Sequence, residues 1–490
     1  TRVSHAIINN GTLSIINNGK IVTKTNSIDQ YIILNNNILN IGYNGMGPTI
    51  EHTGCSSTYW RTICTYGTLN IYGGELITSL DSSITTNYYG RTVVSNGGNG
   101  TINIYGGKLR DLTGVNGMGI EIYDSGKTIN MTCGEIISEG NGIRVYDNVG
   151  NSCSLDLNIT GGSITANGNA ILLYNTSDTV NVNVVSGSII SQNSVAIKST
   201  GNTKIVIGSK DGQVNTNSPV IQSSSIGIEA TNGIEFYDGI IKGKTNAIAK
   251  NSKATSEDGY GVYIYQDGEY EVAIPMVGWD ISKTAGTDNV WAFLVADSTD
   301  STKYNLVIRG TGEMKDYADY DSSEWKAYRS QITKLIIEEG VTSVGDRAFF
   351  GMPEITNIEF PSTMKTIGTF SFFDCTKVIG TINIPASVNS IGGNPFLRVP
   401  VTKYTVEAGN TKYKVLNNAI VTIDGKRAVS YPCGNTDTNI IVPDGVETIR
   451  EYACASTKAV TIGLPNTLKS INFGGFAYNS SLPTFHHICL

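Results

Sequence analysis

The first half of the chain alternates apolar and polar positions in short segments, the period of a β-strand with one buried face. The segment at residues 69–76 (LNIYGGEL) recurs at 102–109 as INIYGGKL, again at 129–136, 157–164 and 182–189, and more loosely at 235–241. A glycine closes the strand of each close copy, at positions 74, 107, 134, 162 and 187. Glycine suits a turn whose dihedral angles a side chain would resist.

A second short apolar segment follows each glycine, at 120–123, 143–146, 171–174, 195–197 and 247–249. One such unit cannot bury its own apolar face, whereas stacked units can. We therefore predict a right-handed parallel β-helix, in which the strands near 69–72, 102–105, 129–132, 157–160 and 182–185 form one parallel sheet in register. This pattern resembles the pectate-lyase-like β-helix superfamily over about residues 10–250, without a diagnostic motif.

The second half of the chain repeats with a different signature. Apolar residues recur every 23 positions, at Ile332, Ile355, Val378 and Val401. The segment at 341–345 (VTSVG) returns at 364–368, 388–392, 446–449 and 468–471. Units of 20–29 residues with one short strand each are typical of leucine-rich repeats.

Two motifs make the resemblance specific. Residues 340–349 (GVTSVGDRAF) and 372–376 (FFDCT) resemble the consensus of BspA-like leucine-rich repeats. The insertion at 402–439 resembles that family's longer, hairpin-bearing repeat, and 279–325 resembles the segment that opens such arrays. The resemblance covers about residues 279–482. It implies a bacterial protein, secreted or displayed on the cell surface, that acts by adhesion or ligand binding and brings no catalytic residues.

Composition separates the same two halves. Residues 1–255 are neutral, so the net charge of −7 lies in 256–490, and only Pro48 and Pro219 precede residue 251. We predict a mainly β protein of tandem solenoids: a β-helix over 1–255, a capping and connecting β segment over 256–312, and leucine-rich repeats over 313–490. The absence of a basic stretch disfavours nucleic acid as a partner. No apolar run is long enough to insert into a membrane.

The eight cysteines do not form an obvious disulfide framework. Cys133, Cys375 and Cys454 occupy regular repeat positions, so we expect small, buried apolar side chains there. Cys55 and Cys64, nine residues apart, form the one plausible bridge, and the unbridged alternative stays open. With four histidines and no CxxC motif, a zinc site is disfavoured.

Catalytic motifs of β-helix enzymes are missing. A polygalacturonase-type site, as the resemblance to β-helix enzymes implies it, contains an aspartate pair and a Gly-His-Gly segment. Neither occurs in this sequence. A lyase would need calcium ligands and a basic residue. The candidate calcium ligands are Asp124 and Asp147, with Asn175 third in the same row, and the candidate bases beside them are Arg144 and Arg110. Aspartate and asparagine at strand ends more commonly cap turns. We expect no metal, no cofactor and no glycosidase or lyase activity. The alternatives are a carbohydrate-active enzyme with a divergent β-helix site and a structural surface stalk.

Two rows of side chains remain as candidate binding surfaces. Tyr123, Tyr146 and Tyr174 end strands of consecutive units, and alternation points them and Glu121 outward, with the rings about 4.8 Å apart. With Arg144 they form the predicted platform for a host protein, glycan or polysaccharide, unless they only stiffen the solenoid. For the asparagine row a stacked structural ladder is favoured over ligand binding; its members are Asn70, Asn103, Asn130, Asn158 and Asn183.

Overall fold

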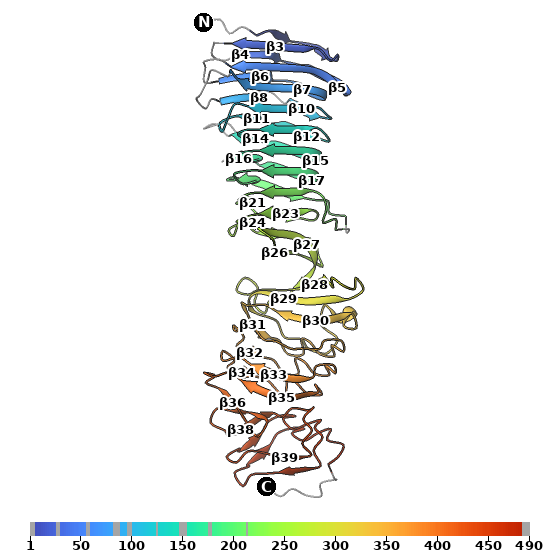
Figure 1. Ribbon diagram of the computed structural model, residues 1–490, viewed down its shortest axis with the longest axis vertical. Helices are drawn as coiled ribbons and strands as arrows, with labels where there is room; N and C mark the ends of the chain where they lie inside the picture. The colour runs from blue at the N-terminus through green and yellow to red at the C-terminus, as the bar shows by residue number, and fades with distance from the viewer. Residues whose placement is uncertain are drawn as a thin grey trace. The chain divides into compact units, whose positions relative to one another are not determined.

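The computed structural model describes residues 5–25, 30–54, 59–81, 89–95, 100–123, 126–146, 154–174, 179–211 and 214–482. Within these ranges the chain consists of β-strands and turns, with one short 3-10 turn at Lys326–Tyr328 (Figure 1). It divides into two compact units, Thr1–Met276 and Val277–Leu490. The predicted class, mainly β with tandem solenoids, is confirmed.

The first unit winds through three parallel sheets, called sheets 1, 2 and 3 here. Four long strands contribute their first half to sheet 1 and their second half to sheet 2: β5 (Ile38–Gly54), β7 (Thr68–Leu80), β15 (Leu155–Ala166) and β17 (Val180–Ser191). Sheet 1 also contains β2 (Thr12–Ile15), β9 (Thr101–Ile104), β12 (Lys127–Met131), β19 (Thr203–Ile207), β22 (Ile234–Phe236) and β25 (Ala254–Thr255). Sheet 2 also contains β3 (Lys20–Thr25), β10 (Lys108–Leu112), β13 (Glu135–Ser138), β20 (Val220–Ser223) and β23 (Ile240–Gly243).

Sheet 3 has ten parallel strands: β1 (Ile7–Asn9), β4 (Gln30–Asn35), β6 (Tyr59–Thr65), β8 (Tyr89–Ser95), β11 (Met118–Ile122), β14 (Asn141–Tyr146), β16 (Ile171–Tyr174), β18 (Ile197–Ser199), β21 (Ile226–Ala230) and β24 (Asn246–Ile248). The "second strand" of the sequence pattern is therefore the third strand of each turn. Sequence reasoning merged the sheet 2 strands with the glycine motif, because only a bend, and no break in apolar alternation, separates them from sheet 1.

The in-register sheet predicted from the repeat is confirmed as sheet 1. Asn103 pairs with both Asn70 and Asn130, and the series continues through Asn158 to Asn183. The repeated glycine forms the bend between sheets 1 and 2. Gly107 has φ +79°, and a Cβ there would lie 2.8 Å from the carbonyl oxygen of Gly74 one turn earlier. A side chain would therefore force adjacent turns apart.

The interior of the first unit is one apolar core of inward-facing side chains from all three sheets. Parallel stacking ends at β27 (Tyr270–Asp280), which pairs antiparallel with β23 after the mostly half-buried strand β26 (Tyr260–Asp267). The second half of β27 already belongs to the second unit.

The second unit begins with the antiparallel strands β28 (Asn289–Ala296) and β29 (Tyr304–Glu313), after which short parallel strands follow in each repeat. These are β30 (Ile332–Ile337), β31 (Val341–Val344), β32 (Thr366–Ile367), β33 (Gly380–Ile384), β34 (Ser390–Ile391), β35 (Val401–Val406), β39 (Asn439–Ile441), β40 (Thr448–Ile449), β41 (Thr461–Gly463) and β42 (Ser470–Ile471). The predicted hairpin insertion contains the antiparallel strands β36 (Tyr413–Leu416), β37 (Ala419–Thr422) and β38 (Arg427–Ser430).

Aromatic side chains form the centre of this unit. Trp325, Phe349, Phe372 and Phe396 are fully buried, and successive ring centroids lie 5.6, 5.4 and 5.9 Å apart. From Trp325 to Phe396 each large ring thus packs on the ring before it, which gives this part of the array a continuous aromatic core.

The cysteine expectations are met only in part. Cys375 and Cys454 are buried as expected, and burial raises the pKa of each thiol to about 12. Cys133, expected to be buried, is exposed, because it lies on the outer side of the bend between β12 and β13. Cys55 lies outside the described residues, so the proposed bridge to Cys64 stays a prediction.

Candidate functional site

The predicted tyrosine row lies on the outer side of sheet 3. Tyr146 pairs in register with Tyr174, which is 48% exposed, whereas Tyr123 and Tyr146 are half-buried. The ring contacts among the described aromatic side chains do not include a stack between these three tyrosines. Instead, the guanidinium carbon of Arg144 lies 4.5 Å from the centroid of the Tyr146 ring. The surface formed is thus a cation–π pair beside an exposed tyrosine.

Glu121 differs from its expected outward exposure: its exposed fraction is 0%. The carboxylate is ion-paired with Arg91, and its Oε1 lies 3.4 Å from Nη1 of Arg144. Burial lowers the pKa of Arg91, and the nearby Tyr123 hydroxyl opposes that shift. Alternation correctly assigns Glu121 to the outer side of the strand, but exposure also depends on what packs over that side. The result is a buried carboxylate that fixes Arg144 beside Tyr146.

The asparagine row forms the hydrogen-bonded ladder that the sequence predicted. The side-chain Nδ2 of each asparagine donates to the side-chain Oδ1 of the asparagine one turn earlier. The series runs from Asn183 back to Asn40, with distances of 2.8 to 3.1 Å. Tyr72 and Tyr105 stand next to the ladder, exposed and stacked with centroids 5.0 Å apart. Sequence reasoning missed this tyrosine pair, although the repeated Ile-Tyr-Gly-Gly motif contained the signal.

The candidate catalytic cluster is not assembled as expected. Arg110 is on β10 in sheet 2, where it pairs with Glu75 at 3.1 Å, whereas Arg144 is on β14 in sheet 3. Asp124, Asp147 and Asn175 lie outside the described residues. Within the described ranges, no group of three or more histidine, cysteine, aspartate and glutamate side chains is arranged to hold a metal ion.

A buried polar row does exist inside the first unit. Asp111 is fully buried and accepts hydrogen bonds from the hydroxyls of Thr113 at 2.5 Å and Ser138 at 2.8 Å. Burial raises its pKa to about 7, against the effect of these two donors. His52 is also buried, and burial lowers its pKa, although its hydrogen bond to the Arg61 carbonyl opposes this. These groups face the interior and hold the corner between sheets 2 and 3.

The second unit carries a connected set of seven half-buried or exposed rings, the aromatic band. It runs from Tyr320 through Phe350, Phe373 and Phe370 to Tyr452, whose ring contacts both Phe473 and Tyr478, with centroid distances of 4.6 to 6.3 Å. Phe473 and Tyr478 are 78% and 68% exposed. In the pairs Phe349–Phe350 and Phe372–Phe373 the first ring enters the core and the second joins the band, which the sequence pattern did not distinguish.

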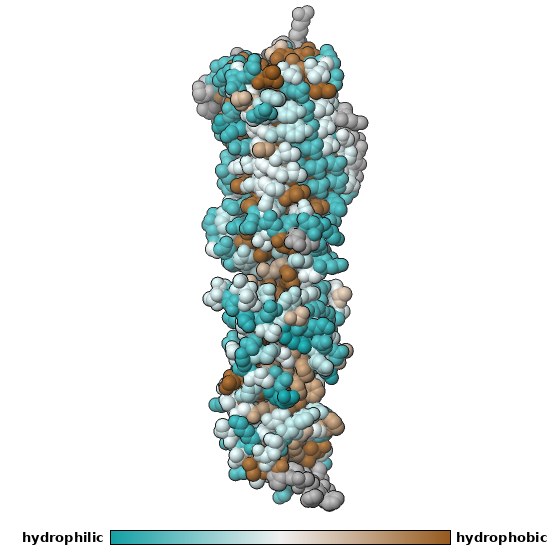
Figure 2. All heavy atoms as spheres, turned by 90° about the vertical axis from the view of Figure 1, so that its right-hand side faces the viewer, coloured by the Kyte–Doolittle hydropathy of each residue, from teal (hydrophilic) through white to brown (hydrophobic). Residues whose placement is uncertain are grey.

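Apolar exposure elsewhere is dispersed. On the face shown in Figure 2, hydrophobic residues form small patches among hydrophilic ones. Among the described residues no helix is both long and apolar enough to cross a bilayer.

Comparison with known proteins finds a similarity in the second unit. Residues 326–418 and 430–487 match, in six copies, the family model described as "BspA type Leucine rich repeat region". No curated protein matches the chain. A leucine-rich repeat protein from Eubacterium ventriosum is similar at 20% identity and TM-score 0.28, over 41% of this chain and 63% of that one.

Two further structures are similar at 15% identity. The pneumococcal vaccine antigen PcpA aligns with TM-score 0.24 over 42% of this chain and 71% of its own. A leucine rich cell surface protein from Faecalibacterium prausnitzii aligns with TM-score 0.16, over 44% and 77% respectively. The chain thus spans about 63% of the length of the Eubacterium protein.

Proposed function

We propose that this chain, whose second unit carries BspA-type leucine-rich repeats, is a non-catalytic adhesion or ligand-binding protein of the bacterial cell surface or exterior. Its ligand is a host protein or a polysaccharide. The repeat family supports this role, because solenoids present extended surfaces on which a large ligand can be held.

The aromatic band is the observation that carries the proposal. Monomeric proteins rarely expose large contiguous apolar surfaces, and such surfaces mark interaction sites. Aromatic side chains are enriched in interface cores, where they supply a large contact area. In this band Tyr320, Phe473 and Tyr478 are exposed and the rings that connect them are half-buried, an arrangement that fits a protein partner.

The test is an array of host-matrix proteins and glycans probed with the intact chain. The double variant Phe473→Ser, Tyr478→Ser should bind the ligand found at least tenfold more weakly, which corresponds to about 1.4 kcal/mol. The matched control is Ile379→Ser, a substitution of an exposed apolar residue outside the band, which should change affinity less than twofold. An array without a ligand, or equal losses in both variants, would refute the proposal.

The first unit offers a second contact surface, the platform of Tyr123, Tyr146, Tyr174 and Arg144. Arg144 and Tyr146 suit a sugar or peptide ligand, because the ring packs flat while the hydroxyl and guanidinium donate hydrogen bonds. Tyr146→Ala should weaken binding with an unchanged melting temperature. Tyr105→Ala, in the stacked pair on sheet 1, is the control. If Tyr146→Ala lowers the melting temperature and leaves affinity intact, the platform is scaffold.

A further inference from the structure

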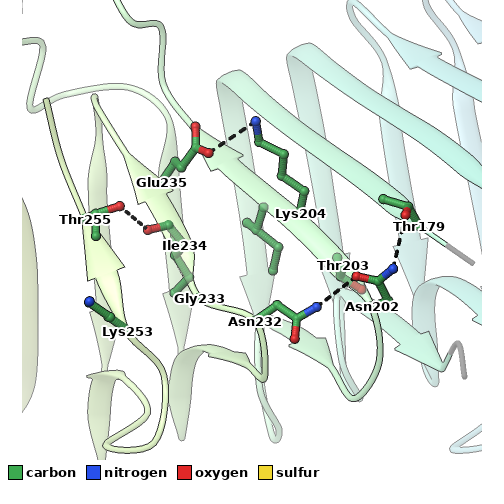
Figure 3. A pocket seen from close by; sticks show the side chains of 11 residues that line it. Thr179, Asn202, Thr203, Lys204, Asn232, Gly233, Ile234, Glu235, Lys253 and Thr255 are labelled. Atoms are coloured by element: carbon green, nitrogen blue, oxygen red, sulfur yellow. Dashed lines mark hydrogen bonds and ion pairs between the residues drawn. The ribbon is translucent and has the colours of Figure 1, made fainter.

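A cavity of about 370 Å³ opens on the outer side of sheet 1, along β19, β22 and β25 (Figure 3). Its volume falls at the lower end of the range for small-ligand pockets, which is about 300 to 1,000 Å³. Its side-chain groups are mainly amides, hydroxyls, two lysines and one carboxylate.

The strand register places three of the lining residues in one row. Ile205 pairs with Ile234, and Ile234 pairs with Ala254, so Lys204, Gly233 and Lys253 precede them in one outward row across three turns. Gly233 has φ +89°, and a Cβ there would lie 2.8 Å from the carbonyl oxygen of Lys253. The Lys253 backbone therefore packs directly against Gly233. No side chain stands between those of Lys204 and Lys253, whose backbones are two strand spacings apart, about 9.6 Å.

Two polar walls flank this gap (Figure 3). On one side the Asn232 amide donates to Asn202 at 3.0 Å, and the Asn202 amide donates to the Thr179 hydroxyl at 3.1 Å. These bonds fix the orientation of both amides. On the other side Lys204 pairs with Glu235 at 3.2 Å.

Glu235 is held as a carboxylate. The Tyr237 hydroxyl donates to its Oε2 at 2.9 Å. Burial acts to raise the pKa of Glu235, but the Tyr237 and Lys204 hydrogen bonds outweigh it and the pKa is lowered. Glu235 therefore neutralises Lys204 and presents a fixed acceptor to the cavity.

Of the two lysines that line the cavity, Lys253 is the one whose positive charge Glu235 does not neutralise. It is exposed, and in the described part of the chain no carboxylate forms an ion pair with it. The cavity thus has one cationic end at Lys253 and a hydrogen-bonding end at Glu235, Lys204 and the amides.

From this arrangement we infer that the cavity binds one acidic sugar residue of a glycan. The sugar carboxylate pairs with Lys253, and the ring hydroxyls bond to the Asn202 and Asn232 amides and to Glu235. A densely charged polyanion fits less well, because Glu235 repels a second negative group. This inference rests on the proposed function, of which it specifies the glycan ligand and its site on the first unit.

The experiment titrates the intact chain calorimetrically with a hyaluronan tetrasaccharide and with sialyllactose. Each sugar is compared with its carboxyl-reduced form, and a keratan sulfate oligosaccharide, which carries sulfate but no uronic acid, tests sulfate. The two carboxylated sugars should distinguish a uronic from a sialic acid, and at least one should bind tenfold more tightly than its reduced form. Lys253→Gln should remove that preference. Asn232→Ala should weaken the acidic and the reduced sugar alike, because it contacts hydroxyls.

Lys198→Gln is the matched control, since it removes one positive charge from sheet 3 of the same unit. It should leave binding unchanged. The inference is wrong if Lys253→Gln binds as the parent does, if reduced sugars bind equally well, or if only the sulfated oligosaccharide without carboxylates binds. Any of these outcomes would refute the acidic-sugar site alone. The proposed function would still hold if the array finds a ligand and the Phe473→Ser, Tyr478→Ser variant binds it more weakly.

Discussion

Glu121 holds two buried or half-buried guanidinium groups in place on sheet 3, those of Arg91 and Arg144. Replacing one member of a buried ion pair costs about 3–5 kcal/mol, because it leaves charge without compensation in a poorly solvated site. We expect Glu121→Gln to lower the free energy of unfolding by about 3 kcal/mol in urea titrations.

Glu229→Gln provides the control for this prediction. Glu229 is in the same outward row of sheet 3 and pairs with Lys198 at 3.2 Å, with both side chains partly exposed. Exposed pairs contribute about 0–1 kcal/mol. Equal effects of the two variants would show that the Glu121 cluster is not energetically distinct.

Asp111 makes stability depend on pH. Its pKa is raised by burial from an ordinary value of 3.8 to about 7. The folded chain therefore binds one proton more than the unfolded chain between these values, so the stability from this group is present below about pH 4 and is lost as pH rises to about 7. Asp111→Asn should flatten this slope and be more stable than the parent at pH 8, measured by urea unfolding from pH 4 to 8. Parallel pH profiles would contradict the assignment.

At the scale of the element, the asparagine ladder joins successive turns of sheet 1. Asn103 both donates to Asn70 and accepts from Asn130, each at 2.8 Å. Asn103→Ala removes two hydrogen bonds, each worth about 0.5–1.5 kcal/mol, so we expect a loss of about 2 kcal/mol in thermal or urea unfolding. Thr101→Ala, a substitution on the same strand, should cost no more than about 0.5 kcal/mol. A similar cost for both would mean that the ladder contributes little.

The strands of sheet 1 were predictable because period-2 alternation and a repeated glycine are local signals. Neighbouring turns then align the same motif, so the register of Asn70, Asn103 and Asn130 follows from sequence. Sheet 2 was not distinguished, since a bend at glycine leaves the alternation intact. In the second unit, the repeat spacing located the strands, but sorting Phe349 from Phe350 needed the packing.

The candidate sites were less predictable, because each depends on what lies one or two turns away. Alternation placed Glu121 on the correct side of its strand and could not report its burial. The cavity on sheet 1 is lined by Lys204 and Lys253, which are 49 residues apart in sequence and reach one row only through the pairing of β19, β22 and β25. Gly233 itself lies outside the glycine motif that defined the repeat.

At the scale of the whole molecule, the compositional change after residue 250 corresponds to two architectures with separate cores. The buried apolar residues of the first unit form one cluster, and those of the second form two others. In solenoids each repeat contacts only its neighbours, so a core defect acts mainly within its own array. Multi-unit chains commonly unfold in more than one step.

Phe372→Ala tests this separation. The side chain is fully buried between Phe349 and Phe396, and its truncation should cost about 3–5 kcal/mol. Three of the four tryptophans, at 279, 291 and 325, belong to the second unit, so tryptophan fluorescence reports mainly on it. The fluorescence-detected urea transition should shift to lower concentration in Phe372→Ala, while a circular dichroism transition from the β-helix stays in place. Ile129→Ala, in the first core, should do the converse. If either variant moves both transitions together, the two units fold as one cooperative body.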